Sequence, residues 1–222
     1  MKELSLTRSE EDHIKAIHTL TRRDGRAATN AISERLSTKA SSVTDMLKKL
    51  AEKRLLKHEP YYGAKLTLKG EAVALQLVRR HRLWETFLVD RLGFGWDEVH
   101  EVAEQMEHVA SEKLVDKLEA YLGHPHFDPH GDPIPDKHGR IRQRKTKSLD
   151  SCGPGESVRI VAVSETTDGL LRLLDSKGLR IGTTLVVQEV HAFDGSMDVK
   201  PKSGSAFSLS KDVSDHLQVE PS

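Results

Sequence analysis

Histidine and carboxylate side chains with helical spacing are concentrated in one stretch of the sequence, between residues 79 and 110. Two sets occur there: His81 and Glu85, then His100, Glu104, Glu107 and His108. Residues three, four, seven or eight apart share one face of an α-helix, so each set would present its side chains together. Imidazole nitrogens and carboxylate oxygens gathered on one face can bind a divalent transition metal.

The second set lies in an unusually acidic segment. Six acids and no Lys or Arg occur between residues 97 and 112. Like charges three or four residues apart destabilise a helix by roughly 0.2–0.5 kcal/mol per pair, and a bound cation would offset this repulsion. A solvated acidic face with hydrogen-bonded histidines explains the same pattern, and Glu101, Gln105 and Glu112 fit that interpretation. This segment alone leaves both interpretations open.

Composition limits the class of protein. The 34 Lys and Arg residues balance 34 Asp and Glu residues, so any nucleic-acid-binding surface must be local. The single Cys152 excludes an internal disulfide and a cysteine-rich zinc motif, and it agrees with a reducing compartment. No apolar run reaches the roughly 18 residues of a membrane span, and the N-terminus lacks a signal-peptide core. We therefore expect a cytoplasmic protein without a membrane partner.

The first 70 residues predict a DNA-binding unit. The helix expected from residue 7 to residue 24 includes Ser9 and Asp12, whose spacing predicts a capping box that would give Asp12 a purely structural role. Two short helices opening at Thr29 and Ser41 follow, and the brief turn between them indicates a helix-turn-helix. Strands over residues 55–59 and 64–68 would add a hairpin. This order of elements is that of a winged helix.

Basic residues are clustered around the second of these short helices. Seven lie between residues 35 and 57, against two acids, which indicates a surface that contacts phosphates. The residues expected to contact DNA lie at the start of that helix, one turn further along it, and at the hairpin tip: Lys39, Ser41, Ser42, Thr44, Asp45, Lys48, Tyr61 and Tyr62. A lysine-rich exposed helix face with no DNA partner is the alternative.

The remaining elements would position the metal ligands and add a second domain. A helix over residues 69–91 has more apolar surface than one amphipathic face needs, which predicts contact with a partner subunit. A further helix is expected over residues 111–122. The loop after it contains three histidines among prolines, and such loops rarely hold three ligands, so we expect a structural role for His124, His126 and His130.

A basic, solvated tether then leads to short β-runs at residues 158–163, 170–174, 185–191 and 197–200, which predict a small barrel.

Taken together, these features resemble the DtxR/MntR family of metal-dependent transcriptional repressors, in its longer form with a C-terminal SH3-like domain. The resemblance covers essentially the whole chain and implies a mainly α fold with a small all-β domain. The implied parts are a winged helix-turn-helix (residues 1–70), a helical metal-binding and dimerisation domain (71–136), a basic linker (137–151) and an SH3-like, FeoA-like β-barrel (152–222). The motifs that carry it are Arg80-His81-Arg82-Leu83-x-Glu85, Val99-His100-Glu101-x-x-Glu104-x-x-Glu107-His108, Ser41-Ser42-Val43-Thr44-x-Met46-x-x-Lys49-Leu50 and Pro129-His130-Gly131-x-Pro133-Ile134-Pro135.

The resemblance also implies the ligands. It places Asp12, Glu104, Glu107 and His108 at the principal metal site. It places His81, Glu85 and His100 at a second site, with the alternative that His81 joins the first. Some members add carboxylates from the barrel, and Glu165 and Asp168 occupy the matching stretch.

Two positions bear on the identity of the metal. Iron-sensing members carry Met and Cys where this chain has Asp12 and Glu104, and carboxylates in place of sulfur favour a hard cation. We therefore expect Mn²⁺, with Fe²⁺ as the alternative and other divalent transition metals as substitutes in vitro. Two-domain manganese members have Glu where this chain has Lys15, which argues against a tightly coupled binuclear cluster.

The function implied by the resemblance is metal-activated repression of metal-homeostasis genes, without enzymatic activity or an organic cofactor. Metal binding would fix the geometry of a homodimer on double-stranded operator DNA. Two other functions remain to be compared. A carboxylate-bridged metalloenzyme needs paired Glu-x-x-His helices, whereas this chain has one Glu104-x-x-x-His108 and no second copy. A winged-helix regulator of a small organic ligand would leave the acidic helix merely solvated.

Overall fold

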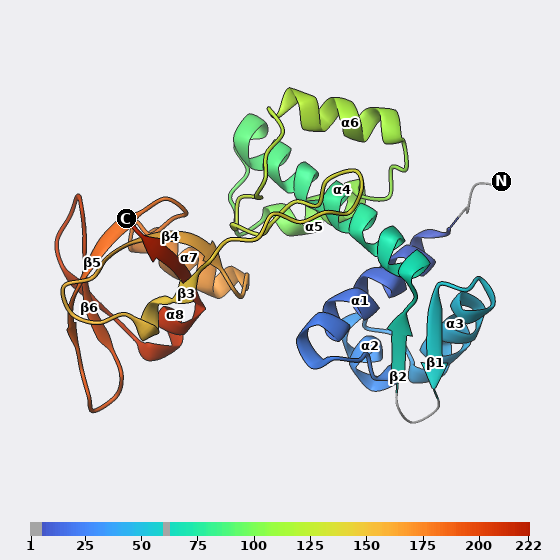
Figure 1. Cartoon of the computed structure of the whole chain (residues 1–222), viewed down its shortest axis with the longest axis horizontal. Helices are drawn as coiled ribbons and strands as arrows, with labels where there is room; N and C mark the ends of the chain where they lie inside the picture. The colour runs from blue at the N-terminus through green and yellow to red at the C-terminus, as the bar shows by residue number, and fades with distance from the viewer. Residues whose placement is uncertain (1–5, 60–62) are drawn as a thin grey trace. The chain divides into compact units, whose positions relative to one another are not determined.

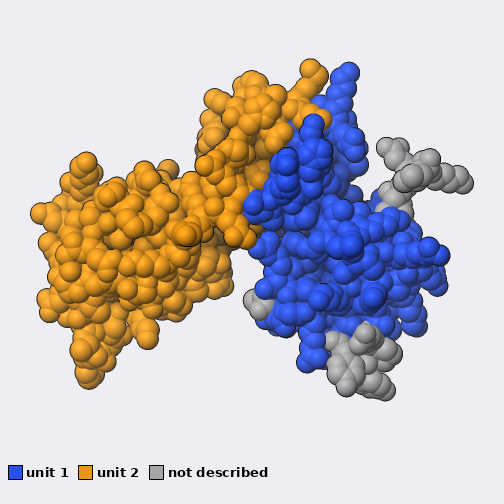
Figure 2. Space-filling view, in the orientation of Figure 1, with its two compact units in different colours: residues 1–81, 104–115, 135–141 blue, residues 82–103, 116–134, 142–222 orange. Residues whose placement is uncertain are grey.

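The computed structural model describes residues 6–59 and 63–222. The chain forms two compact units (Figure 2). Unit 1 comprises residues 1–81, 104–115 and 135–141, and unit 2 comprises residues 82–103, 116–134 and 142–222. None of the helices within the described residues has the length and apolar character needed to cross a membrane.

Unit 1 contains the predicted winged helix. Its elements, visible in Figure 1, are α1 (Arg8–Asp24), α2 (Thr29–Arg35), α3 (Ala40–Glu52), β1 (Leu56–Glu59) and β2 (Gly63–Leu66). The two strands pair antiparallel, with Leu56 opposite Leu66. The helices close on an apolar core built from one stripe of each, namely Ile14, Ile17, Ile32, Val43, Leu47 and Leu50. The predicted helix-turn-helix and hairpin are therefore confirmed, with ends shifted by one or two residues.

The start of α1 differs from the expected capping box. Thr7 has the extended backbone of an N-cap residue (φ −81°, ψ 158°) and forms the capping box with Glu10. The Glu10 amide donates to Thr7 Oγ1 at 3.4 Å, and the Thr7 amide donates to Glu10 Oε2 at 2.8 Å. The assignment of the box to Ser9 and Asp12 is wrong because the N-cap residue is Thr7, two residues before Ser9. Asp12 therefore lies beyond the first turn and does not cap the helix.

The hairpin is followed by α4 (Leu68–Leu92), α5 (Val99–Met106) and α6 (Glu112–Tyr121). Among the predicted ligands, His81 and Glu85 lie in α4, and His100 and Glu104 lie in α5. The long α4 and the shorter α6 are as predicted. The expectation of one helical face through residue 108 is wrong, because α5 ends at Met106. Glu107 and His108 lie in the turn after it. This turn directs the Glu107 carboxylate into the interior, where it is 1% exposed.

Unit 2 contains a six-stranded antiparallel sheet with strand order β3-β8-β4-β5-β6-β7. Its strands are β3 (Lys147–Ser148), β4 (Ser157–Val163), β5 (Thr184–Val190), β6 (Met197–Pro201), β7 (Phe207–Leu209) and β8 (Leu217–Pro221). Two short helices, α7 (Asp168–Ser176) and α8 (Lys211–His216), and a 3₁₀ turn (Leu149–Ser151) belong to the same unit. The predicted strands at residues 158–163, 185–191 and 197–200 are confirmed, whereas β3, β7 and β8 were not expected.

The strand predicted at residues 170–174 is wrong, because this segment lies within α7. Leu171 and Leu174 are buried, whereas Leu173 is 39% exposed. Burial three residues apart is the period of a helix, and leucine also favours a helix over a strand. In so short a run, apolar content alone does not distinguish the two.

The basic segment predicted to be a solvated tether makes contacts in both of its parts. In unit 1, the Lys137 carbonyl accepts a hydrogen bond from Gln76 Nε2 at 3.0 Å. In unit 2, the Arg144 guanidinium lies 3.7 Å from the centre of the Phe127 ring. Such cation–π contacts stabilise a packed position for a charged side chain.

Candidate metal centres and nucleic-acid interface

Three predicted ligands converge in unit 1 and form what we call the first centre. Asp12 comes from α1, and Glu107 and His108 follow α5; each offers a ligand atom, and these atoms all lie within 4.8 Å of one another. His108 Nε2 is 3.2 Å from Asp12 Oδ1 and 3.9 Å from Glu107 Oε1. Two carboxylates and one imidazole in this arrangement fit a divalent cation. Glu104, the fourth predicted ligand, lies nearby with its side chain 51% exposed.

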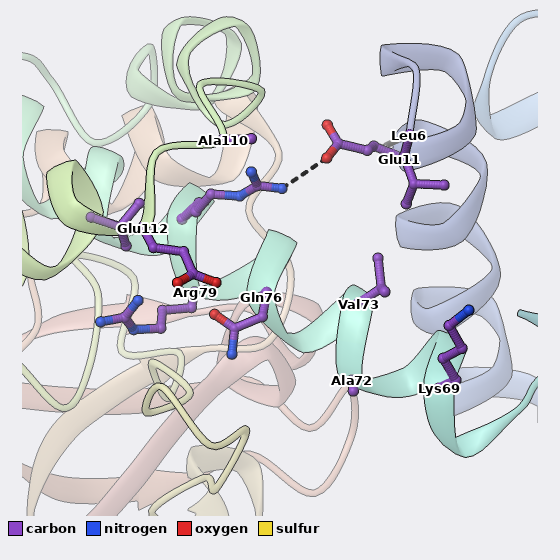
Figure 3. Close-up of a pocket in the computed structure, with 11 residues that line it drawn as sticks. Leu6, Glu11, Lys69, Ala72, Val73, Gln76, Arg79, Ala110 and Glu112 are labelled. Carbon is purple, nitrogen blue, oxygen red and sulfur yellow. Dashed lines mark hydrogen bonds and ion pairs between the residues drawn. The ribbon is translucent and has the colours of Figure 1, made fainter. Parts of the chain in front are cut away.

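The orientation of His108 is fixed by a residue that the sequence did not single out. His108 Nδ1 lies 2.7 Å from Glu11 Oε2, and Glu11 Oε1 accepts a hydrogen bond from Arg80 at 2.9 Å. A proton on Nδ1 leaves the Nε2 lone pair facing Asp12 and Glu107. Histidines that bind metals are commonly held in this way by a carboxylate on the other nitrogen. Figure 3 shows Glu11 at a pocket of about 590 Å³ in unit 1, with its ion pair drawn as a dashed line.

A lysine ammonium lies beside the first centre. Lys15 Nζ is 2.6 Å from Glu107 Oε2, 3.1 Å from His81 Nδ1 and 3.8 Å from Glu104 Oε1. Glu107 therefore directs one oxygen toward His108 and the other toward Lys15 and His81, whose Nδ1 is 2.6 Å away. A fixed cation thus takes up the charge on one side of Glu107. The other side faces the three-ligand group.

The two carboxylates of the first centre titrate differently. Burial is the largest influence on Asp12 and raises its pKa, although the nearby His108 opposes the shift. Burial also acts to raise the pKa of Glu107, but the hydrogen bond with His81 and the charge of Lys15 outweigh it and hold the pKa below its usual value. Glu107 is therefore ready to act as a ligand at neutral pH, while a metal at Asp12 must compete more strongly with a proton.

Unit 2 contains a second group of ligand-type side chains. Glu85 Oε1 is 3.2 Å from His100 Nδ1, which brings together two residues predicted for the second site. Ligand atoms of Glu85, Asp128 and His130 also lie within 4.8 Å of one another, and all three residues are buried. Asp128 and His130 were not predicted as ligands, because both belong to the proline-rich loop.

The two carboxylates predicted from the barrel lie on an exposed segment. Glu165 Oε2 is 3.7 Å from His216 Nε2, and Asp168 Oδ2 is 3.4 Å from Arg172. Within the residues that the structure describes, neither belongs to a group of ligand-type side chains. Their role as ligands stays a prediction.

Five of the predicted DNA-contacting residues, Lys39, Ser41, Ser42, Thr44 and Asp45, lie at the start of α3, and Lys48 lies further along it. Lys39, Ser41, Ser42, Asp45 and Lys48 are exposed. Lys48 Nζ is 3.2 Å from Asp45 Oδ1, an exposed pair that is weak enough for DNA phosphates to displace. Half-buried Thr44 donates its hydroxyl to the Ala40 carbonyl at 3.0 Å. The hairpin-tip residues Tyr61 and Tyr62 lie outside the described residues.

In comparisons with known proteins, three segments of the chain each match a protein-family model. Residues 5–64 match the iron-dependent repressor N-terminal DNA-binding domain, residues 67–136 the iron-dependent repressor metal-binding and dimerisation domain, and residues 147–221 the FeoA domain. The transcriptional regulator MntR of Lysinibacillus sphaericus is 39% identical over 112 residues, which are 50% of this chain and 80% of that protein. A solved manganese-dependent transcriptional repressor in complex with manganese has a TM-score of 0.85 at 34% identity, covering 96% of this chain and 100% of the other.

The chain belongs to the DtxR/MntR family of metal-dependent transcriptional repressors. The iron-dependent repressor IdeR of Mycobacterium leprae is also similar, with 38% identity over 104 residues, 47% of this chain and 45% of that protein. The chain spans less than half the length of the mycobacterial repressors that it matches. Because the DtxR/MntR family is one of repressors rather than enzymes, the metalloenzyme interpretation is wrong.

In this DtxR/MntR family member, α1 connects the first centre to the helix-turn-helix. Glu10 is fully buried, and its Oε1 lies 2.6 Å from Lys53 Nζ and 3.2 Å from Lys49 Nζ. Lys49 is in the last turn of α3 and Lys53 is its C-cap residue. The helix that carries Asp12 therefore also holds the C-terminal end of the helix predicted to read DNA. Lys53 and Lys49, together with the capping hydrogen bond, outweigh the effect of burial and lower the pKa of Glu10 to about 2.

Proposed function

We propose that this protein represses metal-homeostasis genes when Mn²⁺ binds at the first centre, and that it binds operator DNA as a homodimer. One observation carries the proposal. Asp12 on α1 and Glu107 with His108 after α5 place their ligand atoms within 4.8 Å of one another, although they are far apart in sequence. An ion bound by these residues ties the DNA-reading unit to the segment that follows α5.

Mn²⁺ is the preferred ion because the donors are carboxylates and an imidazole, without sulfur. The solved manganese-bound repressor at 34% identity supports the same choice, and the similarity to IdeR keeps Fe²⁺ as the alternative. Glu104 completes the first centre as a fourth ligand. His81, Glu85 and His100 are assigned to a second site, to which Glu165 and Asp168 are candidate additions.

The proposed mechanism acts through the position of α1. A bound ion fixes α1 through Asp12, and the Glu10 ion pairs with Lys49 and Lys53 carry that constraint to α3. The metal activates only if it binds this arrangement more tightly than others, with a coupling of typically about 1–3 kcal/mol per site. By linkage, operator DNA tightens Mn²⁺ binding by the same factor.

On DNA, the exposed start of α3 enters the major groove. The residues that face the major groove are Lys39, Ser41, Ser42, Thr44 and Asp45, while Lys48 and the Tyr61-Tyr62 tip lie near phosphates. A homodimer presents two such helices at a fixed spacing, which must match half-sites one or more helical turns apart. Exposed apolar side chains such as Leu114, 39% exposed, and Tyr121, 62% exposed, are candidates for the subunit contact.

The proposal assigns residues 1–70 to DNA binding, 71–136 to metal binding and dimerisation, 137–151 to a linker and 152–222 to the FeoA-like domain. Because operator DNA is the partner, we place the protein in the cytoplasm. No organic cofactor takes part.

A selection experiment identifies the operator sequence and tests the function together. A random-sequence duplex pool is selected with the full-length protein in Mn²⁺, and the enriched duplex is used in gel shifts. We expect a shifted band in Mn²⁺ that disappears with a chelator and returns when Mn²⁺ is restored. Equal binding with and without the metal would contradict the proposal. Calorimetric titration with Mn²⁺ and, anaerobically, with Fe²⁺ then ranks the two metals.

A further inference from the structure

The proline-rich loop is held in place at the residues that face Glu85. The Asp128 carboxylate accepts two backbone hydrogen bonds on Oδ1, from the amides of His130 and Asp132, both at 2.9 Å. The His130 carbonyl accepts from the Val163 amide of β4 at 3.0 Å. Gly131 has a φ of +87°, and a Cβ there would lie 2.0 Å from the Val161 carbonyl oxygen. Only glycine fits so close to the sheet, so the backbone of the loop is held in a fixed conformation at this residue.

The imidazole of His130 is oriented with one nitrogen toward a carboxylate. Its Nε2 lies 2.7 Å from the Trp96 carbonyl, an acceptor, so Nε2 carries a proton. Its ring stacks on the Trp96 indole, with ring centres 6.1 Å apart and planes 10° from parallel. Nδ1 then faces Glu85 Oε2 at 3.9 Å, which is beyond hydrogen-bonding distance. In the neutral imidazole, the Nδ1 lone pair and the Glu85 oxygen are both acceptors, and a cation bound to both could span the 3.9 Å between them.

The charged side chains around His130 favour the binding of a cation. Glu85, Asp128 and Asp132 are carboxylates, and Arg82 is a cation that contacts both Asp128 and Asp132. Arg82 directs its two terminal nitrogens elsewhere: one is 2.7 Å from Asp132 Oδ2, and the other is 2.5 Å from the Pro133 carbonyl. Only its Nε approaches Asp128 Oδ2, at 3.4 Å. A divalent ion would add positive charge beside the buried carboxylates of Glu85 and Asp128.

We propose that Glu85, Asp128 and His130 bind a divalent transition-metal ion in unit 2, with the Trp96 carbonyl fixing the tautomer of His130. This inference deepens the proposed function, because it rests on Glu85 as a residue of the second site and adds two ligands from the proline-rich loop. Two carboxylates and one imidazole suit Mn²⁺ in the same way as the first centre does. A backbone carbonyl that accepts from the second nitrogen of a ligand histidine is a common feature of metal sites.

Trp96 provides a local probe of this site. The chain has two tryptophans, and Trp84→Phe leaves Trp96 as the single one. Paramagnetic Mn²⁺ bound at His130 Nδ1 would lie beside the stacked indole and quench its fluorescence, whereas diamagnetic Mg²⁺ would not. In the Trp84→Phe protein, we expect Mn²⁺ to quench Trp96 emission in a saturable manner, with a second Mn²⁺ bound per chain by equilibrium dialysis.

Two substitutions test the ligands while keeping the loop in place. His130→Gln can still donate to the Trp96 carbonyl, and Asp128→Asn can still accept both amide hydrogen bonds on its remaining oxygen. Each is expected to weaken the second Mn²⁺ at least tenfold and to remove the saturable quenching. His126→Gln makes the same change at an exposed position of the same loop and should behave like the parent. Circular dichroism and thermal unfolding check that each variant is folded.

The outcomes separate this inference from the proposed function. If folded His130→Gln and Asp128→Asn both bind two Mn²⁺ per chain with parental affinity and quenching, the inference is overturned. If they lose the second Mn²⁺ while the first still stimulates DNA binding, the inference is supported. Failure of the proposed function would instead appear as DNA binding by the parent protein that does not respond to any metal.

Discussion

At the scale of single residues, the proposed metal binding at the first centre depends on side chains that are not among its ligands. Glu11 lies beside Asp12 in sequence, yet its carboxylate faces His108 Nδ1 at 2.7 Å and Arg80 at 2.9 Å. Because it sets which nitrogen of His108 is free, it controls the basicity and direction of a ligand. Spacing along the chain does not distinguish this role from that of an ordinary acid in the first turn of a helix.

Glu11→Gln should therefore weaken Mn²⁺ binding without removing a ligand. We expect the Mn²⁺ affinity to fall roughly 10- to 100-fold, as is typical when the partner of a ligand histidine is changed. Calorimetric titration measures the loss. Glu34→Gln, at an exposed position of α2, is the matched control and should not change it. Parental affinity in Glu11→Gln would show that His108 is oriented by other contacts.

We infer that Lys15 limits the number of ions that the first centre can hold. Its ammonium lies within 4 Å of Glu107, His81 and Glu104, where a second metal ion would otherwise compensate the same charges. Lys15→Glu replaces this fixed cation with a ligand, so we expect one more Mn²⁺ per chain by equilibrium dialysis. Lys15→Met removes the charge without adding a ligand and should not add an ion. An unchanged stoichiometry in Lys15→Glu would contradict this role.

At the scale of the elements, the contact between α1 and α3 should make stability depend on pH. The pKa of Glu10 is lowered to about 2 from 4.5, so the folded state favours the ionised carboxylate. A lowered pKa stabilises the fold above the unfolded-state value and loses this contribution as the pH falls toward about 2. Denaturant unfolding of metal-free protein should show Glu10→Gln to be less stable than the parent at pH 7, by roughly 3 kcal/mol at most.

The difference between Glu10→Gln and the parent should shrink between pH 4.5 and pH 2, because the parent then becomes protonated too. A difference that stays constant over this range would mean that the carboxylate charge does not hold α3. The comparison is made on metal-free protein, so that metal ligands do not contribute to it.

The exposed part of α3 should contribute to DNA affinity through phosphates. Lys48→Ala should weaken binding to every duplex and reduce the salt dependence by about one phosphate equivalent. Gel shifts or fluorescence anisotropy at several salt concentrations measure the slope. Lys113→Ala, an exposed lysine at the start of α6, should leave the slope unchanged. A Lys48→Ala variant that changes sequence preference instead would place Lys48 against a base.

The elements also show what periodicity can and cannot predict. The helices α1, α3, α4 and α6 were predictable because their apolar residues recur at helical spacing over ten residues or more. The short run at residues 170–174 was not, because five residues fit a strand or a helix equally well. The ends of α1 and α5 depend on side-chain contacts, such as Thr7 with Glu10, that no pattern of apolar residues contains.

At the scale of the whole molecule, the ligand residues of the first centre were predicted, but their geometry was not. Asp12, Glu107 and His108 come together only because separate helices pack into unit 1. Nothing in the sequence indicated that Asp128 and His130 lie together with Glu85, since the position of the proline-rich loop depends on its packing against the sheet. Family resemblance assigns ligands at matching positions, whereas the neighbours of those ligands become known only from the packing of the chain.

The central claim is that one ion couples α1 to DNA binding through Asp12, and Asp12→Asn tests it most directly. The variant is measured for unfolding of the metal-free protein, for Mn²⁺ affinity, and for Mn²⁺-stimulated binding to the selected duplex. Because Thr7 and Glu10 cap α1, we expect no loss of stability without metal. We also expect Mn²⁺ affinity to fall and metal stimulation of DNA binding to disappear. Unchanged Mn²⁺ affinity together with full metal stimulation in Asp12→Asn would contradict the account.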